Sequence, residues 1–212
     1  GIPRVRFTTS HPWDFSDEMI DIIAKYDNIM PAIHLPVQSG NDEILRLMGR
    51  RYTSEQYKAL VDKMKARIPN LALTTDIIVG FPNETYEQFL DTLKMVEYVK
   101  YDGAFTFIYS PRVGTPAARM VDNVTSEKHK RFDELVKVVE KEATIKADAL
   151  VGQTVKVLVD GASKKNKDVL SGYSETNKLV HFHGSADLVG KIVKVKIKES
   201  HLYSVIGELV ND

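Results

Sequence analysis

The sequence predicts an α/β protein in two parts, an alternating β/α segment followed by a small five-stranded antiparallel β-barrel. Up to about residue 146, short apolar runs alternate with stretches of helical period, a pattern typical of parallel strands joined by helices. From there to residue 212 the apolar runs follow one another too closely for helices to fit between them, as in a closed or nearly closed barrel. We therefore expect two domains, residues 1–146 and residues 147–212.

Four runs in the first domain have the composition of strands, being rich in β-branched or aromatic residues and closed by Ser, Gly or Pro. They are residues 4–10, 32–38, 71–79 and 103–109. The alternation with helices predicts parallel strands, in an open sheet or in part of a β/α barrel. Along the second run, alternation places His34 and Gln38 on the same side. For His34 alone we expect a hydrogen-bonded core histidine rather than a ligand.

The intervening stretches carry helix signals. In residues 84–99 the apolar side chains follow the i, i+3, i+4, i+7 spacing of one helical face, and residues 125–150 show a longer pattern of the same kind. Ser16 is placed to cap a helix, while Thr53 with Gln56 and Thr85 with Gln88 have the spacing of capping boxes.

The second domain is expected to hold five strands, at residues 153–160, 169–174, 178–183, 191–199 and 202–209. Within the fourth run Lys194, Lys196 and Lys198 alternate with apolar residues, which predicts a row of lysines on one face. Such a row is compatible with a solvated face, a guarded edge strand or phosphate contact. A second lysine group, Lys164, Lys165 and Lys167, lies in a loop, and Tyr173, His181, Phe182 and His183 offer stacking or hydrogen-bonding groups.

Composition excludes several functions. The chain has no cysteine, so it offers no disulfide, no thiolate nucleophile and no cysteine ligand for zinc or an iron–sulfur cluster. No apolar stretch is long enough to span a bilayer, and the first residues lack the features of a signal peptide. We therefore expect a cytoplasmic protein with no membrane partner. Because the chain starts at Gly1 without a methionine, almost directly with a predicted strand, we expect that an N-terminal portion has been removed.

The residues that close the predicted strands are candidates for a site, because the working groups of β/α barrels lie at the carboxyl ends of the strands. Each is compatible with an ordinary turn or cap when taken singly. Together they place hydroxyl, imidazole, amide and guanidinium groups around one rim, as a polar cofactor or a nucleoside requires. The candidates are Ser10, His11, Gln38, Ser39, Asp76, Gly80 and Arg112.

Four segments in order, RVRFTTSHP, HLPVQSG, DIIVGFPNET and YSPRVGTPAA, resemble the second half of the radical-SAM domain of the methylthiotransferases. The segments VLVDGASKKN and LSGYSETNKLVHF are similar to the TRAM domain that closes those enzymes. The resemblance covers essentially the whole chain. It implies the C-terminal part of a radical-SAM, TIM-like barrel followed by an OB-like TRAM barrel that contacts RNA.

The resemblance also implies an activity. Members of the family add a methylthio group to an isopentenyl-adenosine beside the tRNA anticodon, using S-adenosylmethionine and two 4Fe-4S clusters. One cluster cleaves S-adenosylmethionine to a radical and the other supplies sulfur. The cysteines that hold both clusters belong to the N-terminal portion in the family, so we expect the present chain to be inactive alone and to contain no catalytic or metal-binding residue.

By this resemblance Ser10, His11, Gln38, Ser39, Asp76 and Gly80 belong to the cofactor side. Substrate or RNA contact is expected from Arg112, Lys164, Lys165, Lys167, Tyr173, His181, Lys194 and Lys196. Related enzymes that modify a ribosomal protein tend to carry Glu in the YSPRVGT segment, so Arg112 favours RNA, with which a guanidinium can pair or stack. The family usually has Gly at the position of Asn83, a residue that tolerates left-handed backbone angles.

The expected partners are the anticodon stem-loop of tRNA and, for the full-length enzyme, sulfur and electron donors. We expect the full-length enzyme to be a monomer and the present chain to self-associate through unpaired strand edges. Two other functions stay open at this point: a non-catalytic RNA-binding module, and a methylthiotransferase that acts on a ribosomal protein.

Overall fold

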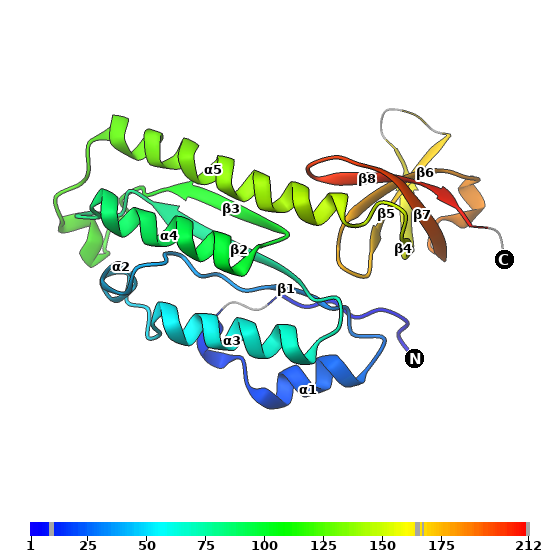
Figure 1. Cartoon of the computed structure of the whole chain (residues 1–212), viewed down its shortest axis with the longest axis horizontal. Helices are drawn as coiled ribbons and strands as arrows, with labels where there is room; N and C mark the ends of the chain where they lie inside the picture. Colours follow the sequence, from blue (N-terminus) through cyan, green and yellow to red (C-terminus); the bar gives the residue numbers. More distant parts are fainter. Residues whose placement is uncertain (9–10, 164–165, 167, 211–212) are drawn as a thin grey trace.

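The computed structural model describes residues 1–8, 11–163, 166 and 168–210. The molecule is elongated, with a sheet and its helices at one end and a β-barrel at the other (Figure 1). The long helix α5 (Thr125–Asp148) leads from the first part into the second.

The first part contains a three-stranded sheet. Strands β1 (Ala32–His34), β2 (Ala72–Val79) and β3 (Gly103–Ile108) lie in the order β1-β2-β3, and both neighbouring pairs are parallel. Three of the four predicted strands and their parallel arrangement are therefore confirmed.

The strand predicted at residues 4–10 is wrong. In the described part of that run, Val5 makes only an isolated bridge to Ile29, and its amide and carbonyl groups pair with Asn28 and Met30. The guanidinium of Arg4 instead donates to the carbonyls of Tyr173 and Lys156 in the barrel, at 2.7 and 3.1 Å. The run holds β-type residues, but the segment that it meets is not a strand, so no ladder continues from Val5.

The strand predicted at residues 32–38 is shorter than expected. β1 ends at His34, because Pro36 has no amide hydrogen for a ladder and Gln38 adopts a left-handed conformation with φ 67°. The alternation of side chains therefore stops before Gln38. The expectation that alternation along one strand places Gln38 on the same side as His34 was wrong.

The helices agree closely with the sequence signals. Ser16 accepts a hydrogen bond from Met19 N at the start of α1, and both predicted capping boxes, at Thr53 and Thr85, are present. None of the helices in the described ranges is long and apolar enough to cross a bilayer. Besides α5, the helices are α1 (Asp17–Lys25), α2 (Asp42–Leu47), α3 (Ser54–Arg67) and α4 (Tyr86–Val99), with short 3-10 turns η1 (Pro12–Asp14), η2 (Pro116–Arg119) and η3 (Ala186–Leu188).

The two faces of the sheet have different environments. Ile33, Leu73 and Ile77 are buried in the core that the helices form over one face. On β3, Phe105 and Phe107 are 61% and 50% exposed, and the sheet register aligns them with Asp76 and Ile78 of β2. Because side chains alternate along a strand, these residues define the open face of the sheet, which the helices leave uncovered.

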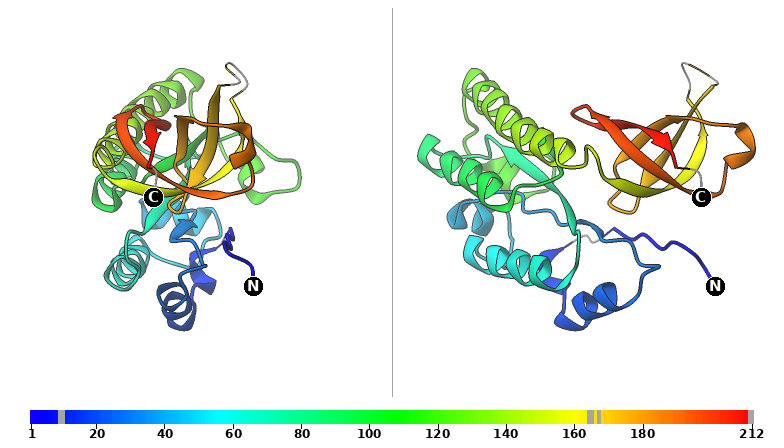
Figure 2. Two further views of the ribbon diagram at one scale, coloured as in Figure 1. Left: turned by 90° about the vertical axis from the view of Figure 1, so that its right-hand side faces the viewer. Right: turned by 45° about the vertical axis from the view of Figure 1, so that its right-hand side comes forward.

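The second part is a closed barrel in the order β4-β5-β6-β8-β7 (Figure 2). Four of its strand pairs are antiparallel, as predicted, but β6 and β8 pair in parallel, so the all-antiparallel expectation was wrong for that pair. Strand β7 follows β6 in the chain but pairs with β4 and β8, so β8 becomes the neighbour of β6 without a hairpin between them. The strands are β4 (Thr154–Ala162), β5 (Val169–Ser174), β6 (Leu179–His183), β7 (Ile192–Ser200) and β8 (Ser204–Leu209).

Polar contacts join the two parts. Besides the hydrogen bonds of Arg4, Ser200 of β7 donates to Asp148 at the end of α5, and Tyr203 donates to Glu140 of the same helix at 3.4 Å. The barrel therefore lies against α5 and the N-terminal segment.

Candidate functional site

Gln38 and Asp76 lie side by side at the carboxyl half of the sheet. The amide of Gln38 donates to the carbonyl of Asp76 at 2.8 Å, and the amide of Ile78 donates to the carbonyl of Gln38 at 2.9 Å. These bonds carry the chain from β1 across β2 although β1 itself has ended. The structure thus brings two of the predicted site residues together through their backbones.

The Asp76 side chain lies on the open face, where it meets His34. His34 Nε2 is 3.3 Å from Asp76 Oδ1, and His34 Nδ1 is 3.0 Å from Thr74 Oγ1. The ring of Phe105 packs edge-on against the imidazole, with the centroids 5.8 Å apart. His34 has hydrogen-bond partners, as expected of a satisfied histidine, but it is only half-buried, so the open face combines a carboxylate, an imidazole and an exposed aromatic ring.

Ser39 has no exposed surface. Its hydroxyl lies 3.3 Å from the hydroxyl of Thr92 in α4, which also accepts a hydrogen bond from Gly40 N at 2.9 Å. A Cβ atom at Gly40 would lie 2.3 Å from the carbonyl oxygen of Asp91. Ser39 therefore anchors the loop after β1 to α4, and Thr92, which the sequence did not single out, is its partner.

Gly80 begins the turn after β2 and adopts φ 67°. Its amide donates to Glu84 Oε2 at 2.8 Å, and Arg131 Nη1 donates to the same oxygen at 3.1 Å and to the carbonyl of Glu84 at 2.8 Å. Glu84 and Arg131 are buried. Burial raises the pKa of Glu84, although the Gly80 amide and Arg131 act in the opposite direction. The pair holds the turn that follows β2.

The side chain of Lys128 in α5 packs against the same turn at Gly80. A Cβ atom at Gly80 would lie 2.5 Å from Lys128 Cγ, and the buried Lys128 ammonium pairs with Asp122 and lies 5.5 Å from the centre of the Tyr109 ring. Glu84, Lys128 and Arg131 were missed in the sequence. The only signal in the sequence was that these charged residues stand next to apolar residues at positions where a buried side chain is expected.

His11 caps η1, where its Nδ1 accepts from Trp13 N at 3.3 Å. Its ring packs edge-on against Tyr52 at 5.6 Å, and Tyr52 donates to Val37 O at 2.9 Å. Burial, followed by the nearby Arg50, lowers the pKa of His11. His11 is thus linked to the segment before Gln38 through one tyrosine. Ser10 lies outside the described residues.

Arg112 is exposed in the loop that follows β3. Its carbonyl accepts from the amide and hydroxyl of Thr115 at 3.1 and 2.8 Å, which closes a turn. The loop continues the same carboxyl edge of the sheet as Gly80, since β2 and β3 are parallel neighbours. Arg112 therefore follows the strand next to the one that Gly80 follows.

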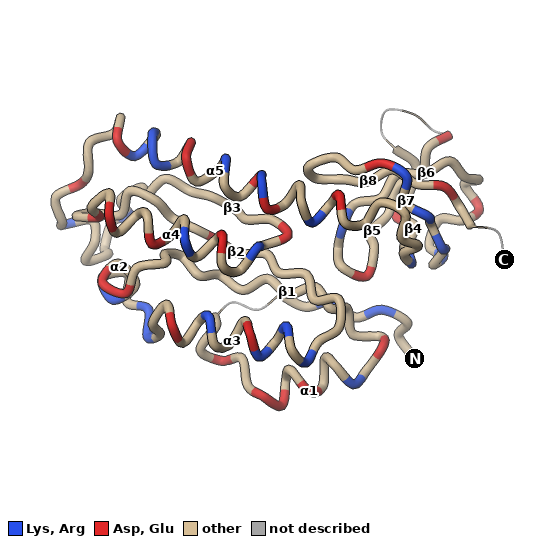
Figure 3. Tube along the Cα trace, in the orientation of Figure 1, with Lys and Arg blue, Asp and Glu red and all other residues tan. Residues whose placement is uncertain are grey.

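The predicted lysine row on the barrel is confirmed. Lys194, Lys196 and Lys198 are exposed, while Val195 and Ile197 between them are buried. Lys194 lies directly opposite Lys156 of β4. Figure 3 shows blue, positively charged segments on the barrel strands. Lys156 also lies 3.7 Å from Glu175, so part of the positive charge on these two strands is compensated.

The other barrel candidates are separated from that row or outside the description. Tyr173 is 40% exposed on β5, opposite Leu158 of β4. His181 lies on β6 between Ser171 and Ile206. Lys164, Lys165 and Lys167 fall outside the described residues.

Metal ligands are not assembled in the described segments, where no group of three His, Asp or Glu side chains is placed to hold an ion. The full sequence has no cysteine. This chain therefore provides no ligand set of the kind that binds an iron–sulfur cluster.

Comparison with known families identifies both parts. Residues 1–96 match the Radical SAM superfamily and residues 148–210 match the TRAM domain. Coproporphyrinogen III oxidase (HemN) from Escherichia coli, described as a radical SAM enzyme, has a similar fold, with a TM-score of 0.55 and 15% identity over 92% of this chain and 46% of that one.

Curated relatives match the chain from end to end. It is 56% identical over 212 residues to the tRNA-2-methylthio-N(6)-dimethylallyladenosine synthase of Geobacillus kaustophilus and 53% identical over 213 residues to the protein of the same name from Staphylococcus aureus. Both alignments cover 100% of this chain, which spans only 40% and 41% of the length of those relatives.

Proposed function

We propose that the chain belongs to the radical SAM methylthiotransferases that end in a TRAM domain, and that it is the part of such an enzyme that completes the cofactor side and holds the tRNA. The proposed reaction adds a methylthio group to an isopentenyl-adenosine beside the anticodon. The proposed partner is the anticodon stem-loop. Sulfur and electron donors would serve the full-length enzyme.

The identity of 56% along all 212 residues carries this proposal. It extends through the sheet, through α5 and through the barrel, so it does not rest on the barrel or the sheet alone. The combination of a radical SAM segment with a TRAM domain in one chain supports the same function. We also propose that the two domains divide at residues 146 and 147.

Radical SAM proteins use S-adenosylmethionine and 4Fe-4S clusters, which together supply radical and sulfur chemistry when bound. Without cysteine, the present residues do not fit the clusters. They do fit one side of a site for S-adenosylmethionine, because the Asp76 carboxylate, 28% exposed on the open face, can accept from ammonium and hydroxyl groups.

We assign Asp76 a direct role on the cofactor side. Gln38 is buried and its backbone is bound to Asp76 and Ile78, so we assign it the positioning of the strand that carries Asp76. Ser39 is fully buried and the Gly80 amide is already bound to Glu84, so we assign these two residues the positioning of the loops around the cofactor. His11, through its contact with Tyr52, would position the segment before Gln38.

For RNA we assign Arg112 to the substrate side and Lys194 and Lys196 to phosphate contact. A guanidinium pairs with phosphate in a bidentate manner or stacks on a base, and lysines on an exposed strand neutralise the RNA backbone. Tyr173 provides an exposed ring for stacking.

The decisive experiment is nucleoside analysis of tRNA from a strain that lacks the full-length gene. We expect methylthio-isopentenyl-adenosine to disappear and isopentenyl-adenosine to accumulate, and the full-length gene to restore the wild-type pattern. Unchanged methylthio-adenosine would refute the proposed substrate. A simultaneous loss of mass from a ribosomal protein would then assign the protein to the ribosomal branch.

A further inference from the structure

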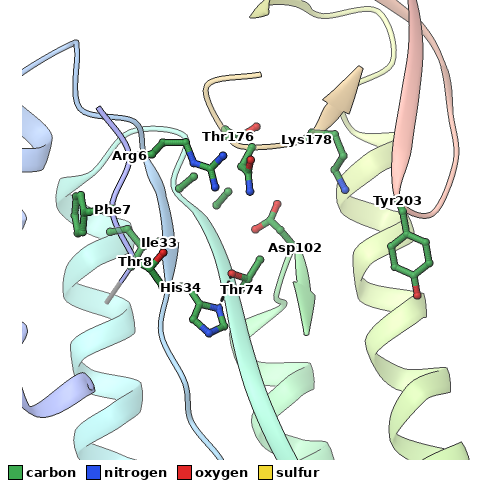
Figure 4. Close-up of a pocket in the computed structure, with 13 residues that line it drawn as sticks. Arg6, Phe7, Thr8, Ile33, His34, Thr74, Asp102, Thr176, Lys178 and Tyr203 are labelled. Atoms are coloured by element: carbon green, nitrogen blue, oxygen red, sulfur yellow. Dashed lines mark hydrogen bonds between the residues drawn. The ribbon is translucent and has the colours of Figure 1, made fainter. Parts of the chain in front are cut away.

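A cavity of about 170 Å³ lies where the sheet meets the barrel. Its walls come from the N-terminal segment around Arg6, from the whole of β1 up to His34, from Ala72 and Thr74 of β2, and from Asp102 just before β3. Two barrel loops contribute Asn177, Lys178 and Tyr203 (Figure 4). It therefore lies at the amino ends of the strands, opposite the edge that carries Gly80 and Arg112.

Two cations face this cavity. Lys178 is half-buried, and no carboxylate of the described chain lies within 4 Å of its ammonium. Burial lowers the pKa of Lys178, while Asp102 acts to raise it. Arg6 contributes a guanidinium from the opposite wall, and Figure 4 shows both charged groups directed toward the space between the walls. Because two cations line the cavity against the one carboxylate of Asp102, the cavity favours a singly charged anionic ligand such as a phosphodiester.

The cavity also offers hydrogen-bond acceptors. Asn177 Oδ1 is buried, and none of the described residues donates a hydrogen bond to it, which is costly unless a ligand supplies a donor. Asp102 Oδ2 already accepts from Leu73 N at 2.9 Å, and the carboxylate has further lone pairs for a hydroxyl. A ligand that fits is an anion with neighbouring hydroxyl groups.

We propose that this cavity binds one phosphate-ribose unit of an RNA strand. The phosphate would lie between Arg6 and Lys178, and a ribose hydroxyl would donate a hydrogen bond to Asn177 Oδ1. The assignment rests on the proposed function and adds a second RNA contact to it. The cavity is smaller than the roughly 300 Å³ of a typical small-molecule site. It therefore encloses phosphate and sugar and leaves the base outside, as in a contact with an RNA backbone.

The position of the cavity defines which nucleotide it holds. Strand β2 runs from Ala72, in the cavity wall, to Val79, next to Gly80, a span of roughly 23 Å at about 3.3 Å per residue. His34 and Thr74 also line the cavity, and His34 lies 3.3 Å from Asp76. The bound unit therefore adjoins the open face at the end away from Gly80. The cavity is an anchor for flanking RNA and not the place of the reaction.

The test measures binding of an anticodon stem-loop RNA to the full-length protein by fluorescence anisotropy at several salt concentrations. Lys178→Gln should weaken binding about fivefold or more and lower the salt dependence by about one phosphate contact. The matched control is Lys130→Gln, which removes an exposed lysine of α5 and should leave both quantities unchanged. Thermal unfolding of each variant verifies the fold.

A second variant separates the sugar contact from the charge. Asn177 has φ 61°, which glycine adopts readily, so Asn177→Gly removes the acceptor without strain. It should weaken RNA binding several-fold with an unchanged salt dependence. Equal affinities for wild type, Lys178→Gln and Asn177→Gly would overturn the assignment.

Adenosine 5′-monophosphate distinguishes the source of the ligand. If the wild type binds it and Lys178→Gln loses that binding while keeping its affinity for the stem-loop, the cavity is a free-nucleotide site and the RNA assignment is overturned. Failure of the wild type to bind any stem-loop would instead contradict the proposed function itself, and the anchor with it.

Discussion

Glu84 and Arg131 show how one buried pair holds the turn after β2. Both Gly80 N and Arg131 Nη1 donate to Glu84 Oε2, while Glu84 Oε1 is buried without a partner in the described structure. Such a pair contributes little net stability, but removing one member leaves an uncompensated charge in the interior. The turn is therefore sensitive to either residue.

Arg131→Met should destabilise the fold by about 3 kcal/mol near neutral pH, because Glu84 stays buried without its partner. Chemical unfolding of the 212-residue chain measures this loss. Arg67→Met, which removes an exposed arginine near Asp17 and Asp21, is the control and should cost less than about 1 kcal/mol. Equal losses in the two variants would show that the buried pair is not important for stability.

The pH dependence of Arg131→Met has a defined sign. Burial already raises the pKa of Glu84 above its ordinary value of 4.5, and loss of Arg131 raises it further. A carboxyl group with a raised pKa in the folded state binds its proton more tightly there, so its stabilising effect is present at low pH and is lost as the pH rises. The destabilisation should therefore be smaller at about pH 5 than at about pH 8. A larger loss at the acidic pH would contradict this account.

Arg112 permits a test of the substrate side in the full-length protein. Arg112→Glu should weaken binding of the anticodon stem-loop about tenfold, because a carboxylate repels the phosphate that a guanidinium would pair with. Arg119→Glu makes the same change on η2, where Arg119 is also exposed, and controls for net charge. The role assigned to Arg112 would be lost if both variants bound RNA equally well.

Among the structural elements, the barrel depends on close approach between its strands. At Gly172 of β5 a Cβ atom would lie 2.1 Å from the carbonyl oxygen of Leu158, and at Gly207 of β8 it would lie 2.6 Å from that of Lys196. Small barrels need such positions because their strands bend sharply to close. The close approach of the strands encloses the apolar core of the barrel, which includes Val157, Leu170 and Phe182.

Gly172→Ala should destabilise the barrel by about 3 kcal/mol, since a backbone atom cannot move aside as a side chain can. Gly161→Ala in β4 is the matched control, because a Cβ atom there meets nothing within 4 Å, and its effect should stay within about 0.5 kcal/mol. Urea unfolding, monitored by hydrogen exchange of the barrel amides, measures the free energy of unfolding of both variants. Similar unfolding curves for the two variants would refute the close-approach argument.

The sequence predicted elements better than it predicted contacts. Periodicity and capping residues located α4, α5 and the five barrel strands, because these signals are local. The error at residues 4–10 arose because β propensity does not reveal a partner, and Arg4 turned out to contact the barrel. At the site, Gln38 and Asp76 were predicted together, whereas Lys128 and Arg131 come from a helix whose packing on Gly80 no local pattern encodes.

In the whole molecule, the open face of the sheet exposes apolar side chains that none of the described helices covers. Phe105 and Phe107 are exposed there beside Asp76, and β1 and β3 are the edges of the sheet. Exposed aromatic residues on a sheet with free edges favour association.

The 212-residue chain should therefore self-associate at high concentration, and Phe105→Thr with Phe107→Thr should reduce this, as light scattering can measure. Threonine keeps the β propensity of both positions. Val113→Thr with Val121→Thr, at exposed positions outside the strands, is the control and should change nothing. A clean monomer of the unaltered chain under these conditions would contradict the prediction.

Helix α5 contains 24 residues without interruption and is therefore about 36 Å long. Arg131 near its beginning is bound to Glu84, and Asp148 at its end is bound to Ser200. The number of residues in the helix therefore sets the distance and the rotation between the end of the sheet that carries Gly80 and the barrel. One inserted residue would rotate the barrel relative to the sheet by about 100°, so the length of this helix fixes how the two parts face each other.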